Sequence, residues 1–142
     1  MTTLLITHQA CLGHDTAPGH PERPARLQAV LTALSGPGFE ALALREAPDA
    51  TQPELARVHG TEYVAAVLGR MPTDGYVRFD ADTIASPGSR EAAVRAAGAV
   101  RAAVDAVIGG EATNAFCAVR PPGHHAEPNR AMGFCFFNNI AV

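Results

Sequence analysis

The chain has 142 residues, a formal net charge of −3 and 47% hydrophobic residues, against only 18% charged ones. This length and composition predict one folded domain with a substantial core and exclude an intrinsically disordered chain. Nucleic acid is not an expected partner, because its binding needs a surplus of clustered Lys and Arg.

Nothing in the sequence points to a membrane. Arg, Asp or Gly interrupts each apolar run before the roughly 18 residues of a transmembrane helix are reached, and the N-terminus lacks the basic start of a signal peptide. Cys11, Cys117 and Cys135 are odd in number, which is typical of free thiols in a reducing compartment. We expect no membrane partner and a cytoplasmic location. All 11 basic residues are Arg and 28 residues are Ala, a bias typical of GC-rich bacterial genomes.

The N-terminal part predicts a strand, a turn-rich loop and a helix. The short apolar run 4–6 is typical of a buried strand in a parallel sheet. Prolines and glycines between residues 13 and 24 predict a loop. Pro24 can open a helix that ends before Gly36. Its apolar residues share one face: Leu27, Val30, Leu31 and Leu34.

Two helical segments and a loop are predicted next. One starts near Pro53 and is interrupted at Gly60, and Thr61 can cap another that runs to Gly69. Their inward residues are Leu55, Val58, Val64, Val67 and Leu68. Residues 71–85 have no clear period, so we expect a loop there.

A long helix and a strand follow. Ser86 and Pro87 predict the cap and first turn of a helix that ends at Gly109. One face of this helix carries Ala93, Val94, Ala97, Val100, Val104, Val107 and Ile108. Residues 114–119 are apolar on both faces and predict a fully buried strand. Helices between strands indicate an α/β layered fold with a parallel sheet.

The last ten residues, 133–142, form an apolar run without a polar end. Domains usually end in exposed polar segments. We therefore expect the sequence to stop inside a structural element, with residues 1–142 forming part of a longer domain.

The strongest local signal is Arg120-Pro-Pro-Gly-His-His125, directly after the predicted strand. Parallel α/β sheets place their ligand sites at this carboxyl end. Adjacent side chains of a regular strand point to opposite faces, so His124 and His125 can share a site only on the irregular backbone that the Pro-Pro-Gly segment supplies. Paired imidazoles disfavour each other's protonation, and one can serve as a base near pH 7. The alternative is two loop histidines without a chemical role.

Together with Gly133-Phe-Cys-Phe-Phe-Asn-Asn139, this segment resembles the zinc-dependent histone deacetylase family, which includes acetylpolyamine amidohydrolases. Residues 14–27 are similar to the N-terminal signature of class II-like bacterial members. Val58-His59 with Tyr63-Val64, and Ser86-Pro-Gly-Ser89, occur in the family's order. The resemblance covers nearly the whole chain. It implies a three-layer arginase/deacetylase-like fold with a central parallel sheet, of which this chain is the N-terminal part, in a single deacetylase domain.

The resemblance also implies roles for five residues. His125 would be the general base that takes a proton from zinc-bound water and later gives one to the leaving amine, and His124 would hold that water. Gly133 and Phe134 would line the tunnel for the acyl-amine stem, where an aromatic wall suits a methylene chain. Arg26 would lie beside an inner channel and attract the released acetate.

The zinc ligands of the family, two Asp and a His, follow its His pair, and no such motif occurs before Val142. A catalytic zinc needs three protein ligands and an open position. We therefore expect no metal ligands within residues 1–142, ligands further downstream, and an inactive chain as written. The implied substrate is an acylated amine, such as acetyl-lysine or an acetylpolyamine. Loops and homo-oligomer contacts separate these substrates in the family, and the sequence does not rank them.

Three other groups could carry chemistry: His8-Cys11-His14, Cys117 with Cys135, and Asp80 with Asp82. The first has a loose metal-site spacing but falls at a strand end and in a loop. Thiols in apolar runs are made inert by burial, and the carboxylates are typical of a solvated loop rather than of acid–base work. We favour structural roles for all three groups, and a core position for Phe136 and Phe137.

Two functions remain open at this point. The chain is either the N-terminal part of a zinc amidohydrolase that removes an acetyl or related acyl group from an amine, or a non-catalytic remnant or interaction module that exposes the open edge of its sheet. The apolar C-terminal run favours the first, because it would cause aggregation if it were exposed.

Overall fold

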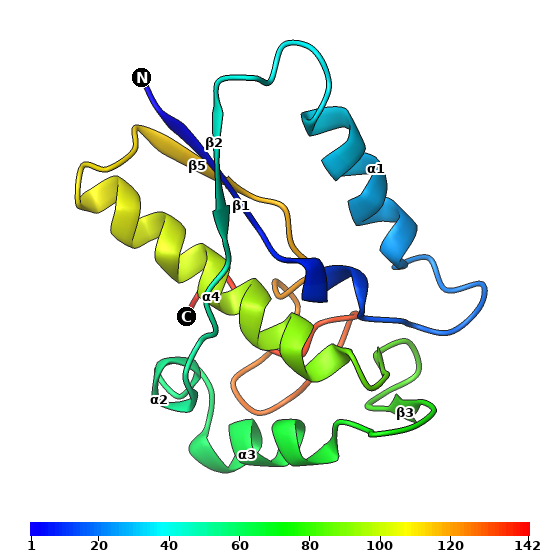
Figure 1. Cartoon of the computed structure of the whole chain (residues 1–142). Coiled ribbons are helices and arrows are strands. Elements are labelled where there is room, and N and C mark those ends of the chain that lie inside the picture. Colours follow the sequence, from blue (N-terminus) through cyan, green and yellow to red (C-terminus); the bar gives the residue numbers. More distant parts are fainter.

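A three-stranded parallel sheet forms one end of the molecule (Figure 1). The computed structural model describes the whole chain, residues 1–142. In it β1 (Thr3–Thr7) lies between β2 (Leu42–Glu46) and β5 (Asn114–Cys117). The predicted α/β class with a parallel sheet is confirmed.

Both outer strands differ from the prediction. The sequence does not predict β2, because this edge strand turns Leu44 outward, 71% exposed, and continues into Arg45 and Glu46. The expected full burial of residues 114–119 is wrong. β5 is the other edge strand, and Phe116 is 50% exposed. An apolar run alone does not distinguish an edge strand from a central one.

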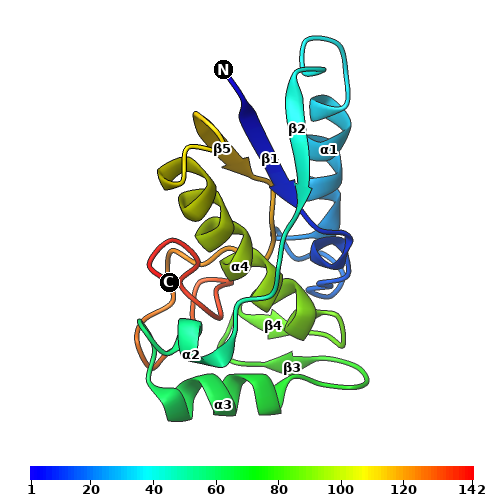
Figure 2. The ribbon, with the colours of Figure 1, turned by 60° about the vertical axis from the view of Figure 1, so that its left-hand side comes forward.

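Helices cover the two faces of β1. Successive residues of a strand point to opposite faces, so Leu5 packs on the side of α1 (Pro24–Leu34), whereas Leu4 and Ile6 pack against α4 (Ser89–Ile108). The result is three layers, helix, sheet and helix, which the turned view separates (Figure 2).

The helix starts and the α1 face are partly as predicted. α1 begins at Pro24, but only Leu27 of its apolar face is fully buried, and Val30 is 38% exposed. α3 and α4 begin after Gly60 and Gly88 rather than after the predicted hydroxyl caps.

The second half of α4 presents a different face from the predicted one. Its buried residues there are small: Ala99, Ala103 and Ala106. The larger residues point outward: Val104, Val107 and Ile108. Gly98 lies against the loop that follows β2, because a Cβ on it would be 2.0 Å from the Pro48 carbonyl oxygen. Close approach of the backbone selects the small side of the helix over the more apolar side.

Short elements form the other end of the molecule. α2 (Gln52–Leu55) and α3 (Thr61–Arg70) occur where helices were expected. Residues 71–85 are more than a loop, since β3 (Val77–Arg78) pairs antiparallel with β4 (Ile84–Ala85). Two-residue strands are too short to produce a detectable period.

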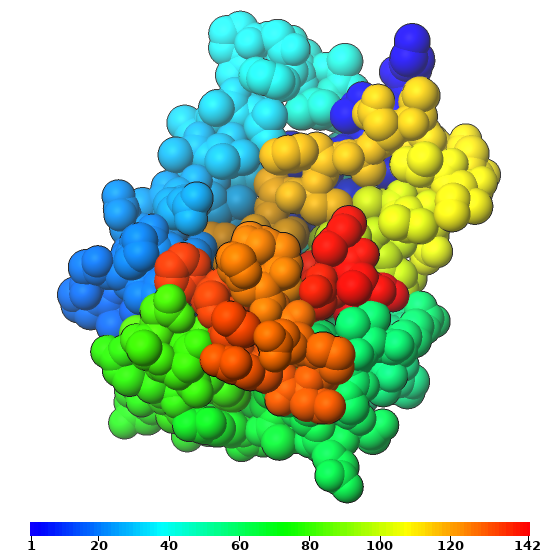
Figure 3. All heavy atoms as spheres, turned by 180° about the vertical axis from the view of Figure 1, so that it is seen from behind, coloured from blue at the N-terminus to red at the C-terminus, as the bar shows by residue number.

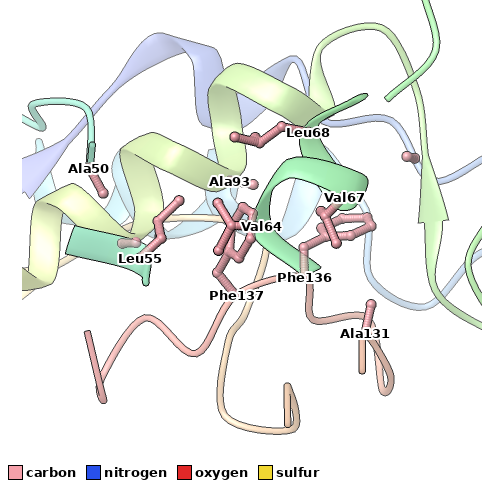
Figure 4. Close-up of a cluster of buried hydrophobic side chains, with 11 residues drawn as sticks. Ala50, Leu55, Val64, Val67, Leu68, Ala93, Ala131, Phe136 and Phe137 are labelled. Carbon is pink, nitrogen blue, oxygen red and sulfur yellow. The ribbon is translucent and has the colours of Figure 1, made fainter. Parts of the chain in front are cut away.

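Phe136 and Phe137 fill a second core, as predicted. They are 0% and 1% exposed and point toward α3 and α4 (Figure 4). Residues 133–142 form turns with no complete helix or strand, and the Val142 backbone N donates to the Asn138 carbonyl at 3.2 Å, as in a single helical turn. These turns pass between the N-terminal region and the α2–α3 region (Figure 3). The run is apolar because its aromatic rings are core.

Large apolar side chains remain exposed on both sides of the unpaired edge of β5. They are Val104, Val107, Ile108, Phe116 and Ile140, and we call them the β5-edge residues. Ile108 is 82% exposed. On the α4 side they border a hollow of about 440 Å³ lined only by apolar residues.

The three cysteines are free, with Cys11 and Cys135 buried and Cys117 half-buried. Burial raises the pKa of each thiol. None of the helices has the length and apolar character that a membrane span requires.

Candidate active site around the paired histidines

His124 and His125 lie side by side on the loop that follows β5. Both are exposed, and their ring centroids are 4.3 Å apart at 53° between the ring planes. The preceding backbone is irregular and includes a cis peptide bond between Arg120 and Pro121. The loop therefore presents two adjacent imidazoles at the carboxyl end of the sheet.

Backbone contacts to the C-terminal turns hold this loop. A Cβ on Gly123 would lie 2.4 Å from the backbone N of Asn139 and 2.5 Å from the Phe137 carbonyl oxygen, so only glycine allows the approach. Asn139 Nδ2 donates to the Pro121 carbonyl at 3.1 Å. The segment after the histidines is thus a structural support for the segment before them.

Gly133 and Phe134 lie next to the histidines. Both have positive φ, +58° and +71°. A Cβ on Gly133 would be 2.8 Å from atoms of the His125 side chain. The Phe134 backbone N donates to Thr83 Oγ1 at 3.1 Å, and its ring meets the His20 ring edge-on at 4.9 Å between centroids. Four of the five predicted site residues therefore belong to one region.

Arg26 lies on the α1 side of the sheet. It is exposed and lines a cavity of about 270 Å³ together with Arg120, Val119 and Pro122. The cavity begins at the strand end that carries the histidine loop.

Two side chains of the α2–α3 region, His59 and Tyr63, contact the backbone on either side of the site residues, and the sequence assigns a role to neither. His59 Nδ1 donates to the Glu127 carbonyl at 3.0 Å, and its Nε2 accepts from the Asn138 backbone N at 2.9 Å. Burial lowers the pKa of His59, which keeps the ring neutral as these two bonds require. Tyr63 donates to the Phe136 carbonyl at 2.6 Å.

A buried polar cluster was also not predicted. Arg120 forms an ion pair with Glu22, and His14 Nδ1 lies 2.6 Å from Ser89 Oγ. Burial, followed by the charge of Arg120, lowers the pKa of His14 to about 3. Contacts between residues so far apart in sequence leave no local pattern, so sequence reading has no signal for them.

The other candidate groups have structural roles. No three His, Cys, Asp or Glu side chains come together in a group that could hold a metal ion. His8 Nδ1 accepts from the Ala10 backbone N at 3.1 Å and so caps the N-terminus of the short 3-10 helix Gln9–Leu12. Asp80 Oδ1 accepts from the backbone N atoms of Asp82 and Thr83, which makes it part of a turn.

Comparison with known proteins identifies the family. A family model described as the histone deacetylase domain matches residues 20–142. The chain belongs to the histone deacetylase family. It is 44% identical over 127 residues to a histone deacetylase-like amidohydrolase of Pseudomonas aeruginosa, covering 89% of this chain and 33% of that protein.

Two further relatives agree. Human polyamine deacetylase HDAC10 is 42% identical over 128 residues, covering 85% of this chain and 19% of that protein. The crystal structure of the HDA15 HD domain matches with a TM-score of 0.89 at 36% identity, covering 99% of this chain and 41% of that one. The fold neighbour confirms the deacetylase-like α/β architecture. The chain spans less than half the length of each of these proteins.

Proposed function

We propose that the protein is a zinc-dependent amidohydrolase that removes an acetyl or similar acyl group from an amine, and that residues 1–142 form the N-terminal part of its single catalytic domain. The paired, exposed imidazoles of His124 and His125 carry this proposal, because they place two proton-transfer groups at the ligand-binding end of a parallel sheet. Relatives named as a deacetylase and an amidohydrolase support the reaction class.

Each site residue has a role in the proposed reaction. His125 takes a proton from the attacking water and later protonates the leaving amine, while His124 holds that water and stabilises developing charge. Gly133 and Phe134 line the tunnel for the methylene stem of the substrate, a task suited to a flat apolar ring. Arg26 attracts the released acetate from the inner side.

The residues of this chain do not by themselves fit a zinc ion, because no group of three ligating side chains is present among them. The proposal therefore assigns the metal ligands to residues outside 1–142. When bound, the metal would polarise the substrate carbonyl and lower the pKa of water.

The proposed substrate is an acylated amine, either an acetyl-lysine protein or an acetylated polyamine. One relative carries the name polyamine deacetylase, and the Pseudomonas aeruginosa relative is named a histone deacetylase-like amidohydrolase. Three free thiols support a cytoplasmic location for this enzyme.

The test measures acetate release from an acetylated lysine peptide and from an acetylated spermidine. The enzyme is the gene product as its native cell makes it, called the natural protein below. We expect His125→Ala to lower kcat by about 10² to 10⁴, the range for loss of a general acid–base group, and a zinc-chelating hydroxamate to abolish turnover. The control is Gln28→Ala on exposed α1 surface. Undiminished turnover in His125→Ala would exclude the assigned base.

The unpaired edge of β5 favours a second candidate, a non-catalytic interaction module. The intact mass of the gene product in its native cell separates the two candidates. A mass well above 14.8 kDa supports the hydrolase, whereas a mass of 14.8 kDa supports the module.

A further inference from the structure

A buried ion pair connects the histidine loop to the first loop of the chain. Arg120 Nε and Nη2 donate to the two carboxylate oxygens of Glu22 at 2.6 and 2.7 Å, and Nη1 donates to the Cys11 carbonyl at 2.9 Å. Arg120 and Glu22 are each 3% exposed. Only Pro121–Gly123 separate Arg120 from His124, so the guanidinium is anchored immediately before the paired imidazoles.

This ion pair supplies orientation more than stability. Removing two charges from water costs free energy that offsets most of their attraction, so a buried pair adds little over an apolar pair of the same volume. The bidentate contact does enforce one geometry, because two N–H groups must meet two oxygens at once. The position of the strand end that carries the histidines therefore depends on Glu22.

Glu22 is linked in turn to Phe134. Its backbone N donates to His20 Nδ1 at 3.1 Å, and His20 Nε2 lies 2.9 Å from the Asp82 carbonyl oxygen, to which it donates. The His20 ring meets the Phe134 ring at 75° between the ring planes. Both sides of the candidate site are thus tied to one residue, the histidine loop through the side chain of Glu22 and Phe134 through its backbone.

We propose that Glu22 is a positioning residue of the active site, holding the histidine loop and Phe134 in one fixed relation. The proposal rests on the proposed function, which assigns these groups to proton transfer and to the substrate tunnel. The first loop, residues 13–23, becomes part of the site without contacting the reacting atoms. One substitution in it is therefore expected to change kcat and KM together.

The test is Glu22→Gln in the natural protein, with Glu111→Gln as the matched control. Glu111 also accepts from an arginine, Arg45 at 2.8 Å, but this pair is exposed, and Glu111 precedes β5 whereas Arg120 follows it. Glu22→Gln is expected to lower kcat by about tenfold or more, because small displacements of reacting groups reduce rates steeply. It is expected to raise KM severalfold, because loss of the charged contact to Arg120 lets the Glu22 backbone, which bonds His20 beside Phe134, shift as well. Glu111→Gln is expected to change each by less than about twofold.

A double-mutant cycle separates positioning from a general loss of stability. Phe134→Ala removes the aromatic ring that lines the proposed substrate tunnel. Adding Glu22→Gln to this variant is therefore expected to raise KM no further, while the loss in kcat remains. Additive effects on KM, or an unchanged kcat in folded Glu22→Gln protein, overturn the proposal. If Glu22→Gln does not fold, Arg120→Lys is the second variant, because it keeps the positive charge but cannot make the bidentate contact to Glu22. Arg120→Lys is then expected to lower kcat, and an unchanged kcat overturns the proposal.

Backbone NMR distinguishes this proposal from the proposed function. Glu22→Gln is expected to shift the amide resonances of residues 123–126 and 133–135, and Glu111→Gln to shift neither segment. If the wild-type protein has no deacetylase activity but both segments shift in Glu22→Gln, the proposed function is refuted and the linkage through Glu22 is supported. If the wild-type protein is active but neither segment shifts in Glu22→Gln, the linkage is overturned.

Discussion

The contact between Gly133 and His125 provides a direct perturbation of the candidate site. A Cβ on Gly133 would lie 2.8 Å from Cβ, Cγ and Cδ2 of His125, at a backbone φ of +58°. Gly133→Ala therefore has two effects. It forces an L-residue into the left-handed region, which costs roughly 1–2 kcal/mol, and it drives the His125 side chain away.

The displacement sets the expected loss of activity. Carbon atoms in contact settle at about 3.5–4.0 Å, so the His125 side chain must move by about 1 Å. A misplacement of about 1 Å in a catalytic group can lower the rate by about 10²-fold. We therefore expect Gly133→Ala to lower kcat by about 100-fold, with a stability loss of only about 1–2 kcal/mol.

Gly75→Ala is the matched control. Gly75 has a φ of +62° with nothing within 4 Å of its added Cβ, so the substitution introduces the backbone strain without the clash. Urea titrations are expected to show similar losses in the free energy of unfolding for Gly133→Ala and Gly75→Ala, both made in the full-length gene product. Acetate release is expected to fall only in Gly133→Ala. Wild-type kcat in Gly133→Ala, or equal losses of activity in both variants, would refute the reasoning.

Three further predictions concern packing, pH and the β5 edge. Gly98→Ala should lower the free energy of unfolding by about 1–3 kcal/mol, because its Cβ would meet backbone atoms, whereas Gly69→Ala, with open space around it, should raise it by about 0.5–1 kcal/mol; urea titrations giving both changes the same sign would contradict this. Burial lowers the pKa of His14 from 6.5 to about 3, so the unfolded chain binds a proton in this window that the folded chain does not. Unfolding measured at pH 7 and pH 5 should show a loss of about 2 kcal/mol that His14→Gln reduces, and an unreduced loss would point to other groups. In the 142-residue chain alone, Phe116→Ser with Ile108→Asp should reduce self-association in sedimentation experiments, because both side chains are exposed beside an unpaired strand, and unchanged association would exclude this surface.

The parts of the fold that sequence could predict are those with a local cause. The run at Leu4–Ile6 has no polar residue, and Pro24 fixes where its helix starts, so both elements follow from a few neighbouring residues. The adjacency of His124 and His125 is equally local, since it needs only an irregular backbone after a strand. Burial of an edge strand is different, because it depends on what lies beside the strand.

The supports of the site could not be predicted, because each joins distant segments. Arg120 and Glu22 are 98 residues apart, and Thr83 and Phe134 are 51 residues apart. No spacing rule relates such partners in a single sequence. The resemblance to a family locates His59 as a familiar residue, but only the structure shows that it joins two carbonyls and a backbone N–H of the histidine region.

The strand that carries the histidine loop is also the strand with the unpaired outer edge. The carboxyl ends of parallel strands meet at one edge of a sheet, so a further parallel strand added to β5 would end beside His124 and His125. Under the proposed function, ligand residues at the end of such a strand would face the paired imidazoles without any change in the loop. The exposed Phe116, Ile108 and Ile140 then have a physical reason, because they lie where such a strand and its covering helix would bury them. Exposure of the β5 edge and the lack of a three-ligand group within residues 1–142 have one explanation under the proposed function.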